Sequence, residues 1–215
     1  MKTIFTSSII LLLLTLVLGC RKRPEKTTGE IKVLSGIYPS VSKGLESGRT
    51  FHVSTLSFSP KGLIESALEP DGSRQWHHLG KEGYWTLLLV GGIKGETPTA
   101  PLSYRTKQSG APFLKGLPPG YARREELSDT LLFKKRYRRF EIRTPHSLTR
   151  YYIFKTDTLC PYEVYPGVYG KYKGRLERID SYDKKRDVFT TFQLLHSATV
   201  SSEGSHVLSL LKPRL

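Results

Sequence analysis

Asparagine is absent from this chain of 215 residues, and cysteine occurs only twice, at Cys20 and Cys160. Without asparagine the chain has no Asn-Gly hairpins, so its turns must use Asp, Gly, Pro and Ser. Two cysteines exclude a scaffold of several disulfides, but a chain of this length buries a substantial core without them. Length favours one domain, with two small domains as the alternative.

Recognisable catalytic motifs are also lacking. No Gly-rich phosphate loop, Gly-x-Ser-x-Gly turn or pair of carboxylates stands out. The adjacent His77 and His78 point to opposite faces of an expected strand, so they do not predict a metal site. Cys160, with His146 or His196, is the candidate for nucleophilic chemistry, but without a local signature it is expected to be a buried, inert thiol. We therefore expect neither a cofactor nor a metal.

The N-terminal segment carries the clearest pattern in the sequence. Lys2 precedes an apolar run over residues 9–18, and Gly19-Cys20 follows that run. A charged start, an apolar core of roughly 7 to 15 residues and a small residue at its end are typical of an export signal. The run Leu-Val-Leu-Gly-Cys at residues 16–20 resembles the lipobox of bacterial lipoprotein signal peptides.

This resemblance covers the first 20 residues. It implies cleavage before Cys20, whose sulfur would carry a diacylglyceryl group, with three acyl chains in all, palmitate among them. Arg21 stands where some bacteria use Asp to retain such proteins in the inner membrane, which implies an outer-membrane address and a domain facing the periplasm. A lipidated Cys20 would leave Cys160 without an intramolecular disulfide partner.

An uncleaved anchor helix is the alternative interpretation of this segment. Residues 4–20 lie at the short limit of the roughly 17 to 25 that span a bilayer, and Ser and Thr dilute them. Three basic residues at 21–23 follow the apolar core. Because basic residues resist translocation, they favour a domain that remains in the cytoplasm, where it would bind anionic lipid or nucleic acid.

Beyond residue 30 the sequence predicts a mainly β fold, built as an antiparallel sheet, a sandwich or a small barrel. The 12 tyrosines and 9 phenylalanines favour strands, and 19 glycines with 13 prolines supply turns. Residues 84–90 are the best core candidate because they are apolar on both faces. Turns are expected at 69–72 and 183–187, and strands at 31–34, 51–58, 63–68, 73–78, 84–90, 130–144, 148–156, 168–180 and 188–195.

The chain is expected to divide into a signal peptide at 1–19, a flexible tether at 20–30 and a β-rich domain at 31–215. The tether has no apolar residue after Cys20 that could seat it in a core. Five prolines between residues 95 and 120 mark a long loop or a division of the domain.

Basic residues exceed acidic ones by 34 to 19, and loss of residues 1–19 removes only Lys2, leaving a formal net charge of +14. Such an excess favours anionic partners. Two clusters on expected strands are the candidate anion-binding residues: Lys134, Lys135, Arg136, Arg138 and Arg139 in the first, and Lys171, Lys173 and Arg175 in the second. The solvated outer faces of strands are the alternative explanation.

An export signal argues against nucleic acid as a partner. Anionic lipid, glycolipid or an envelope protein remains, besides the membrane that holds the anchor. The preferred function is therefore that of an envelope lipoprotein with a non-enzymatic binding or structural role at a membrane surface. The alternatives are an enzyme that modifies cell wall or glycolipid, and an anchored protein that faces the cytoplasm.

Overall fold

The structure, a computed structural model, describes residues 24–46, 48–68, 72–90, 93–96, 100–107 and 110–211. Within these ranges the chain is mainly β, with eleven strands in one antiparallel sheet, which confirms the expected fold class. The expected signal peptide at 1–19 and the expected lipidation site Cys20 lie outside the described residues, as does most of the turn at 69–72. In the described part of the chain, no helix combines the length and the apolar character needed to cross a membrane.

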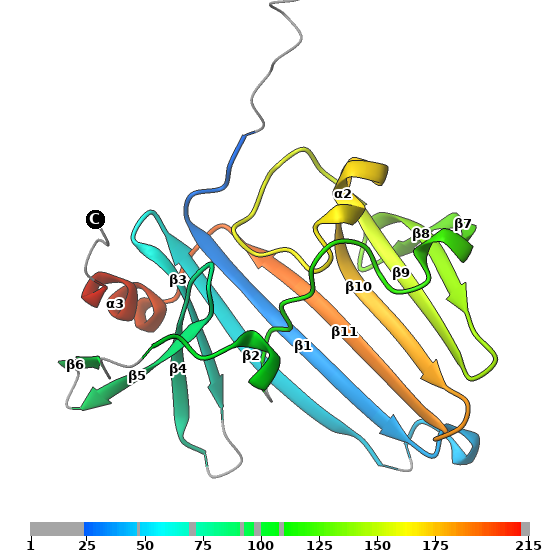
Figure 1. Cartoon of the computed structure of the whole chain (residues 1–215), viewed down its shortest axis with the longest axis horizontal. Helices are drawn as coiled ribbons and strands as arrows, with labels where there is room; N and C mark the ends of the chain where they lie inside the picture. Colours follow the sequence, from blue (N-terminus) through cyan, green and yellow to red (C-terminus); the bar gives the residue numbers. More distant parts are fainter. Residues whose placement is uncertain are drawn as a thin grey trace, which may run out of the picture.

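The sheet is made of two antiparallel meanders (Figure 1). The first contains β1 (Gly29–Pro39), β2 (Thr50–Ser59), β3 (Gly62–Leu68), β4 (Arg74–Leu79), β5 (Tyr84–Val90) and β6 (Ile93–Glu96). The second contains β7 (Glu125–Leu132), β8 (Lys135–Arg143), β9 (Ser147–Lys155), β10 (Gly174–Asp183) and β11 (Val188–Ser197). The remaining elements are η1 (Val41–Lys43), η2 (Tyr104–Thr106), η3 (Tyr121–Arg123), α2 (Gly167–Tyr172) and α3 (Ser202–Leu210).

The two meanders are joined by the pairing of β1 with β11, which extends from Glu30 opposite Ser197 to Pro39 opposite Val188. The strand order is β6-β5-β4-β3-β2-β1-β11-β10-β9-β8-β7, so β6 and β7 are the edges of one open sheet. The described parts of the proline-rich segment at 95–120 therefore connect two halves of the same sheet.

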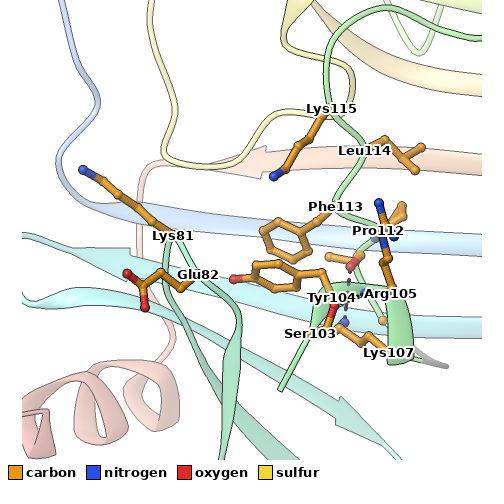
Figure 2. A pocket seen from close by; sticks show the side chains of 12 residues that line it. Lys81, Glu82, Ser103, Tyr104, Arg105, Lys107, Pro112, Phe113, Leu114 and Lys115 are labelled. Atoms are coloured by element: carbon orange, nitrogen blue, oxygen red, sulfur yellow. Dashed lines mark hydrogen bonds between the residues drawn. The ribbon is translucent and has the colours of Figure 1, made fainter. Parts of the chain in front are cut away.

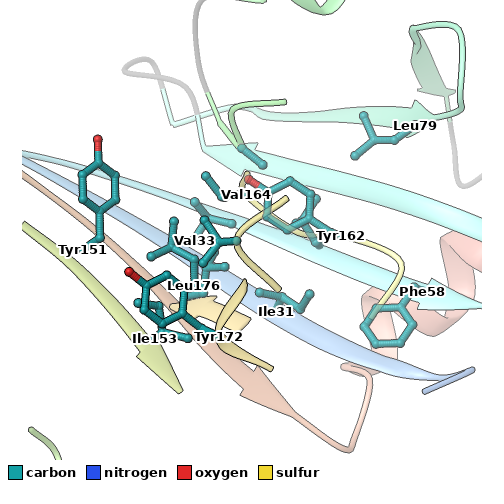
Figure 3. Packing of buried hydrophobic residues seen from close by; sticks show 14 of the residues in the cluster. Ile31, Val33, Phe58, Leu79, Tyr151, Ile153, Tyr162, Val164, Tyr172 and Leu176 are labelled. Carbon is teal, nitrogen blue, oxygen red and sulfur yellow. The ribbon is translucent and has the colours of Figure 1, made fainter. Parts of the chain in front are cut away.

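The larger core lies on one side of the sheet, which we call the inner face. It carries alternate residues of the central strands, including Ile31, Val33, Leu56 and Leu194, all of which are buried. The connection between β9 and β10 covers them with four further buried side chains (Figure 3): Tyr162, Val164, Val168 and Tyr172. Each buried apolar side chain of this size contributes about 1.5–3 kcal/mol to folding.

Helix α3 covers the opposite, outer face at β2, β3 and β4. Val207 and Leu208 of the helix pack with Ile64 and Trp76 in a second, smaller core. The Ser201 hydroxyl accepts a hydrogen bond from Gly204 N at 3.3 Å and so caps the helix. The sequence patterns had not predicted a helix here.

Two expected strands differ from the structure. Residues 130–144 were expected to form one strand, but Phe133 and Lys134 form a turn, so the region belongs to the β7–β8 hairpin. The strand expected at 168–180 is wrong in its first half, because α2 occupies Gly167–Tyr172 and β10 begins at Gly174. Val168 and Tyr172 are four residues apart, so the apolar positions fit one side of a helix as well as one face of a strand.

The expected tether is attached to the domain from Pro24 onward. Leu159 N donates to Pro24 O at 3.0 Å, and Lys26 N donates to Leu159 O at 2.9 Å. Lys26 Nζ also donates to Ser197 O at 2.5 Å, and β1 begins at Gly29. Backbone groups and a lysine hold this segment, so its lack of apolar residues gave no signal of attachment.

Candidate functional site

A strap, defined as residues 100–107 and 110–115, crosses the inner face of the first meander. Its first anchor is a pair of backbone hydrogen bonds between Leu102 and Tyr84 of β5, at 2.8 and 3.0 Å. The Tyr104 hydroxyl donates to Gly80 O at 2.6 Å, and the Tyr162 hydroxyl donates to Pro112 O at 2.8 Å. Burial raises the pKa of Tyr104 to about 12, so its hydroxyl keeps its proton at neutral pH.

A buried ion pair fastens the middle of the strap. Glu65 of β3 has a side chain that is 0% exposed, and Lys107 Nζ lies 2.6 Å from its Oε2 atom. Ala111 N donates to the other carboxylate oxygen at 2.5 Å. Removing one partner of a buried pair typically costs about 3–5 kcal/mol, because a charge is left buried and unpaired. This pair therefore fixes where the strap lies.

Two residues, His77 and Gly110, lie next to the buried carboxylate of Glu65. His77 of β4 pairs with Glu65 across the sheet, and its burial lowers its pKa, with Glu65 opposing and Lys107 reinforcing the change. Gly110 has a φ of +82°, and a Cβ there would overlap the Glu65 carboxylate. Glycine is therefore required at 110 by both backbone conformation and space.

Two adjoining hollows lie beside the strap, with volumes of about 650 and 450 Å³. The rings of Tyr104 and Phe113 line both, stacked with centroids 3.9 Å apart. Figure 2 shows Lys115 of the strap above the rings and Lys81 of the β4–β5 turn to their left. Arg105 lines the larger hollow. Glu163 lines the smaller one, together with apolar side chains: Leu63, Leu79, Leu114, Pro161 and Pro166.

The hollows combine apolar surface with charged side chains. Aromatic and aliphatic surface accommodates an apolar chain, and lysine and arginine side chains at the opening suit a negatively charged group. Lys107 belongs to the ion pair with Glu65, so Lys81, Arg105 and Lys115 are the cations available to a ligand. Glu82 at the larger opening favours cations and offsets part of this charge.

A second buried charge cluster lies around Glu177, at the β-bulge of β10. Its carboxylate accepts hydrogen bonds from Arg175 Nη2 at 2.7 Å, Tyr137 Oη at 3.0 Å and Lys135 Nζ at 3.5 Å. Arg175 Nη1 also donates to Cys160 Sγ at 3.1 Å. Glu177 therefore forms salt bridges with its basic neighbours Lys135 and Arg175.

Cys160 is a free, buried cysteine, as expected. Burial raises the pKa of its thiol, with Arg175 acting in the opposite direction. His146 precedes β9 and Cys160 follows it, so a strand about 30 Å long separates them and they cannot form a catalytic pair. His196 contacts the same cluster, with its Nε2 atom 3.8 Å from Glu177 Oε1. In the described residues no group of three or more His, Cys, Asp or Glu could hold a metal ion.

The structure places the eight basic residues predicted to bind anions in different surroundings. Lys134 and Arg138 are exposed, and Lys171 and Lys173 lie in and after α2 rather than on a strand. The other four make contacts within the protein: Lys135 and Arg175 with Glu177, Arg136 with Asp129, and Arg139 with Ser128. Arg175 lies neither at an anion-accessible surface nor on a solvated outer face, because its side chain is 8% exposed.

The residues of the strap were not identified from the sequence. A charged Glu65 inside the apolar run at 63–68 was the available signal, because a carboxylate in such a strand is buried only if it is paired. Its partner Lys107 lies in the proline-rich segment, where no periodic pattern gives a position.

The comparisons with known proteins find no matching family model and no similar curated protein. Among solved structures, LprF from Mycobacterium bovis is 10% identical, with 82% of this chain and 89% of that chain covered and a TM-score of 0.36. A putative outer membrane lipoprotein-sorting protein domain from Vibrio parahaemolyticus is 12% identical, with 84% and 91% covered and a TM-score of 0.27. A DUF1329 family protein from Desulfovibrio piger is 10% identical, with 87% and 92% covered and a TM-score of 0.30. At these TM-scores, function is argued from the residues of this chain.

Proposed function

We propose that this chain is a lipid-anchored protein of the bacterial envelope that binds an anionic amphiphile beside the strap, without altering it chemically. The observation that carries the proposal is the pair of adjoining hollows that the stacked rings of Tyr104 and Phe113 both line. They place apolar surface next to Lys81, Arg105 and Lys115. A lipid or glycolipid with a negatively charged head group has both complementary parts.

The strap has the rigidity that such a site needs. Its hydrogen bonds to β5, its buried ion pair with Glu65 and the contact of Tyr162 with Pro112 hold the Tyr104 and Phe113 rings in place. A preformed site loses less conformational entropy on binding than a disordered one.

The anchor is the second part of the proposal. Gly19-Cys20 has the sequence of a lipoprotein cleavage site. Pro24, four positions later, is hydrogen-bonded to Leu159 in the connection between β9 and β10. Acyl chains contribute about 0.8 kcal/mol per buried CH₂, so three of them make attachment effectively permanent. Arg21 after the cysteine supports the outer membrane as the address. Mass spectrometry of the mature N-terminus tests the anchor.

The binding test uses residues 21–215, which contain every described residue, and a fatty acid that carries a dansyl group. We expect the dye to brighten on binding, and its neutral alcohol analogue to bind more weakly. The double variant Lys81→Gln/Lys115→Gln should raise Kd about tenfold, because each exposed charge contributes up to about 1 kcal/mol.

The matched control is Lys184→Gln/Lys185→Gln, which removes two exposed lysines from the β10–β11 turn. It should bind the dye as the unchanged protein does. Equal binding of the acid and the alcohol, or equal loss in the two double variants, would overturn the proposed site.

A further inference from the structure

The tip of the β7–β8 hairpin exposes two large apolar side chains to solvent. Leu131 is 70% exposed and Phe133 is 67% exposed, the highest values among the large hydrophobic residues that the structure describes. Phe133 and Lys134 are the two turn residues, and they join the edge strand β7 to β8. Two exposed apolar side chains at one hairpin tip form a surface that suits an apolar partner.

The backbone of the tip is strained in a way that keeps the aromatic ring at the turn. Phe133 has a φ of 51° and Lys134 a φ of 62°, a combination that favours Asn and Gly. A bulky residue at positive φ is uncommon, and such strain is found where a side chain has a function. Glycine would satisfy the same turn without the strain, but it would remove the ring.

Basic side chains surround the tip. Arg136 is 80% exposed and Lys135 is 40% exposed, and Lys134 lies in the turn itself. Lys155 at the end of β9 and Lys173 before β10 are exposed at the same ends of the strands as the tip, which we call the tip end of the sheet. Three acidic residues offset part of this charge and leave a basic excess: Asp129 and Glu177, which pair with Arg136 and Lys135, and Asp157.

The N-terminal segment lies at the tip end of the sheet. Since neighbouring strands are antiparallel, β1 starts at the end of the sheet where β7 ends and β8 starts. Figure 1 shows the chain entering at that end, where α2 also lies. Pro24 is bound to Leu159 there. Pro24 is the fourth residue after Cys20, so the two lie at most about 14 Å apart along an extended chain. An acylated Cys20 would therefore hold the tip end of the sheet close to the bilayer.

We propose that the β7–β8 tip is a membrane-contact site, in which Leu131 and Phe133 enter the boundary between head groups and acyl chains of an anionic bilayer. Lys134 and Arg136 bind the negatively charged head groups around them. The orientation rests on the proposed acylation of Cys20, whereas the affinity of the tip for lipid does not. Apolar side chains flanked by lysine and arginine are the pattern of interfacial binding.

The test measures binding of residues 21–215 to phosphatidylcholine vesicles with and without phosphatidylglycerol. We expect preference for the anionic vesicles, weakening as salt rises. Phe133→Gly should reduce binding about tenfold through loss of the buried ring. Glycine accepts a positive φ, so this variant keeps its fold and the loss is not one of stability. In Phe133→Trp the emission should shift to the blue when anionic vesicles are added.

Two matched controls lie at the other ends of the strands, away from the tip. Leu68→Ser removes an apolar side chain that is 62% exposed, and Lys185→Gln removes a lysine from an exposed turn. Both should bind vesicles normally, whereas Lys134→Gln should bind less at low salt. Normal binding by Phe133→Gly, or equal loss in Leu68→Ser, would overturn the proposal.

The membrane-contact proposal and the amphiphile-site proposal can be overturned independently of each other. Lys81→Gln/Lys115→Gln should retain vesicle binding, and Phe133→Gly should retain binding of the dansyl fatty acid. If the dye does not bind but the tip variants lose vesicle binding, the amphiphile site is wrong and the membrane contact stands.

Discussion

His196 is a buried base among cations. Its side chain is 8% exposed, and burial, followed by the charges of Arg175, Lys135 and Lys26, lowers its pKa to about 3. Glu177 Oε1 lies 3.8 Å away but accepts a hydrogen bond of 2.7 Å from Arg175, so its charge is already compensated. His196 is therefore neutral in the folded protein at neutral pH.

This charge state predicts loss of stability in acid. The pKa of an unfolded histidine is about 6.5, so below that pH the unfolded chain binds a proton that the folded chain does not. We expect the free energy of unfolding to fall as pH decreases from about 6.5 toward 3, by at most about 1.4 kcal/mol per pH unit for this residue. Urea unfolding at several pH values measures the slope, and His196→Gln should reduce it.

The slope that remains in this variant comes in part from His77, whose pKa is also lowered by burial. His146→Gln, which removes an exposed histidine, is the matched control. If His196→Gln keeps the slope of the unchanged protein, the neutral state assigned to His196 is wrong.

At the scale of elements, the central strands were predictable and the helices were not. The strands expected at 51–58, 63–68, 84–90 and 188–195 match β2, β3, β5 and β11, because alternation and turn residues act locally. Helix α3 contains Gly204 and three serines, so its pattern is weak, and contact with the sheet stabilises it. The strap has no pattern at all, because an ion pair between residues 65 and 107 positions it.

Gly204 allows α3 to pack closely on the sheet. A Cβ at this position would overlap Ser57 Oγ of β2. We expect Gly204→Ala to reduce the free energy of unfolding by about 1–3 kcal/mol, because overpacking displaces the helix although alanine favours it. Urea unfolding followed by circular dichroism measures the change.

The matched control for that substitution is Gly170→Ala in α2. No atom lies within 4 Å of a Cβ placed there, so helix propensity alone acts. We expect this variant to be more stable by about 0.5–1 kcal/mol. Stabilisation by both substitutions would show that α3 does not pack on Ser57 as described.

At the scale of the molecule, the sheet depends on contacts that local patterns do not encode. Lys26 and Ser197 are 171 residues apart and share a hydrogen bond, and β1 pairs with β11 along its whole length. The sequence therefore predicted a mainly β chain but left open whether it forms one domain or two. Pairing of β1 with β11 joins the two meanders in one sheet, which favours one domain.

One sheet with a shared core should unfold as one unit. The chain offers a native probe in each half: Trp76 and Trp85 on β4 and β5, and the buried thiol of Cys160 in the second. In residues 21–215 Cys160 is the only thiol, so labelling reports unfolding around it. Without denaturant we expect slow labelling, because burial shields the sulfur and raises the pKa of the thiol. As urea increases, Trp fluorescence and rapid labelling of Cys160 should change at one midpoint. Two separate midpoints would mean that the halves unfold independently and that the β1–β11 pairing does not unite them.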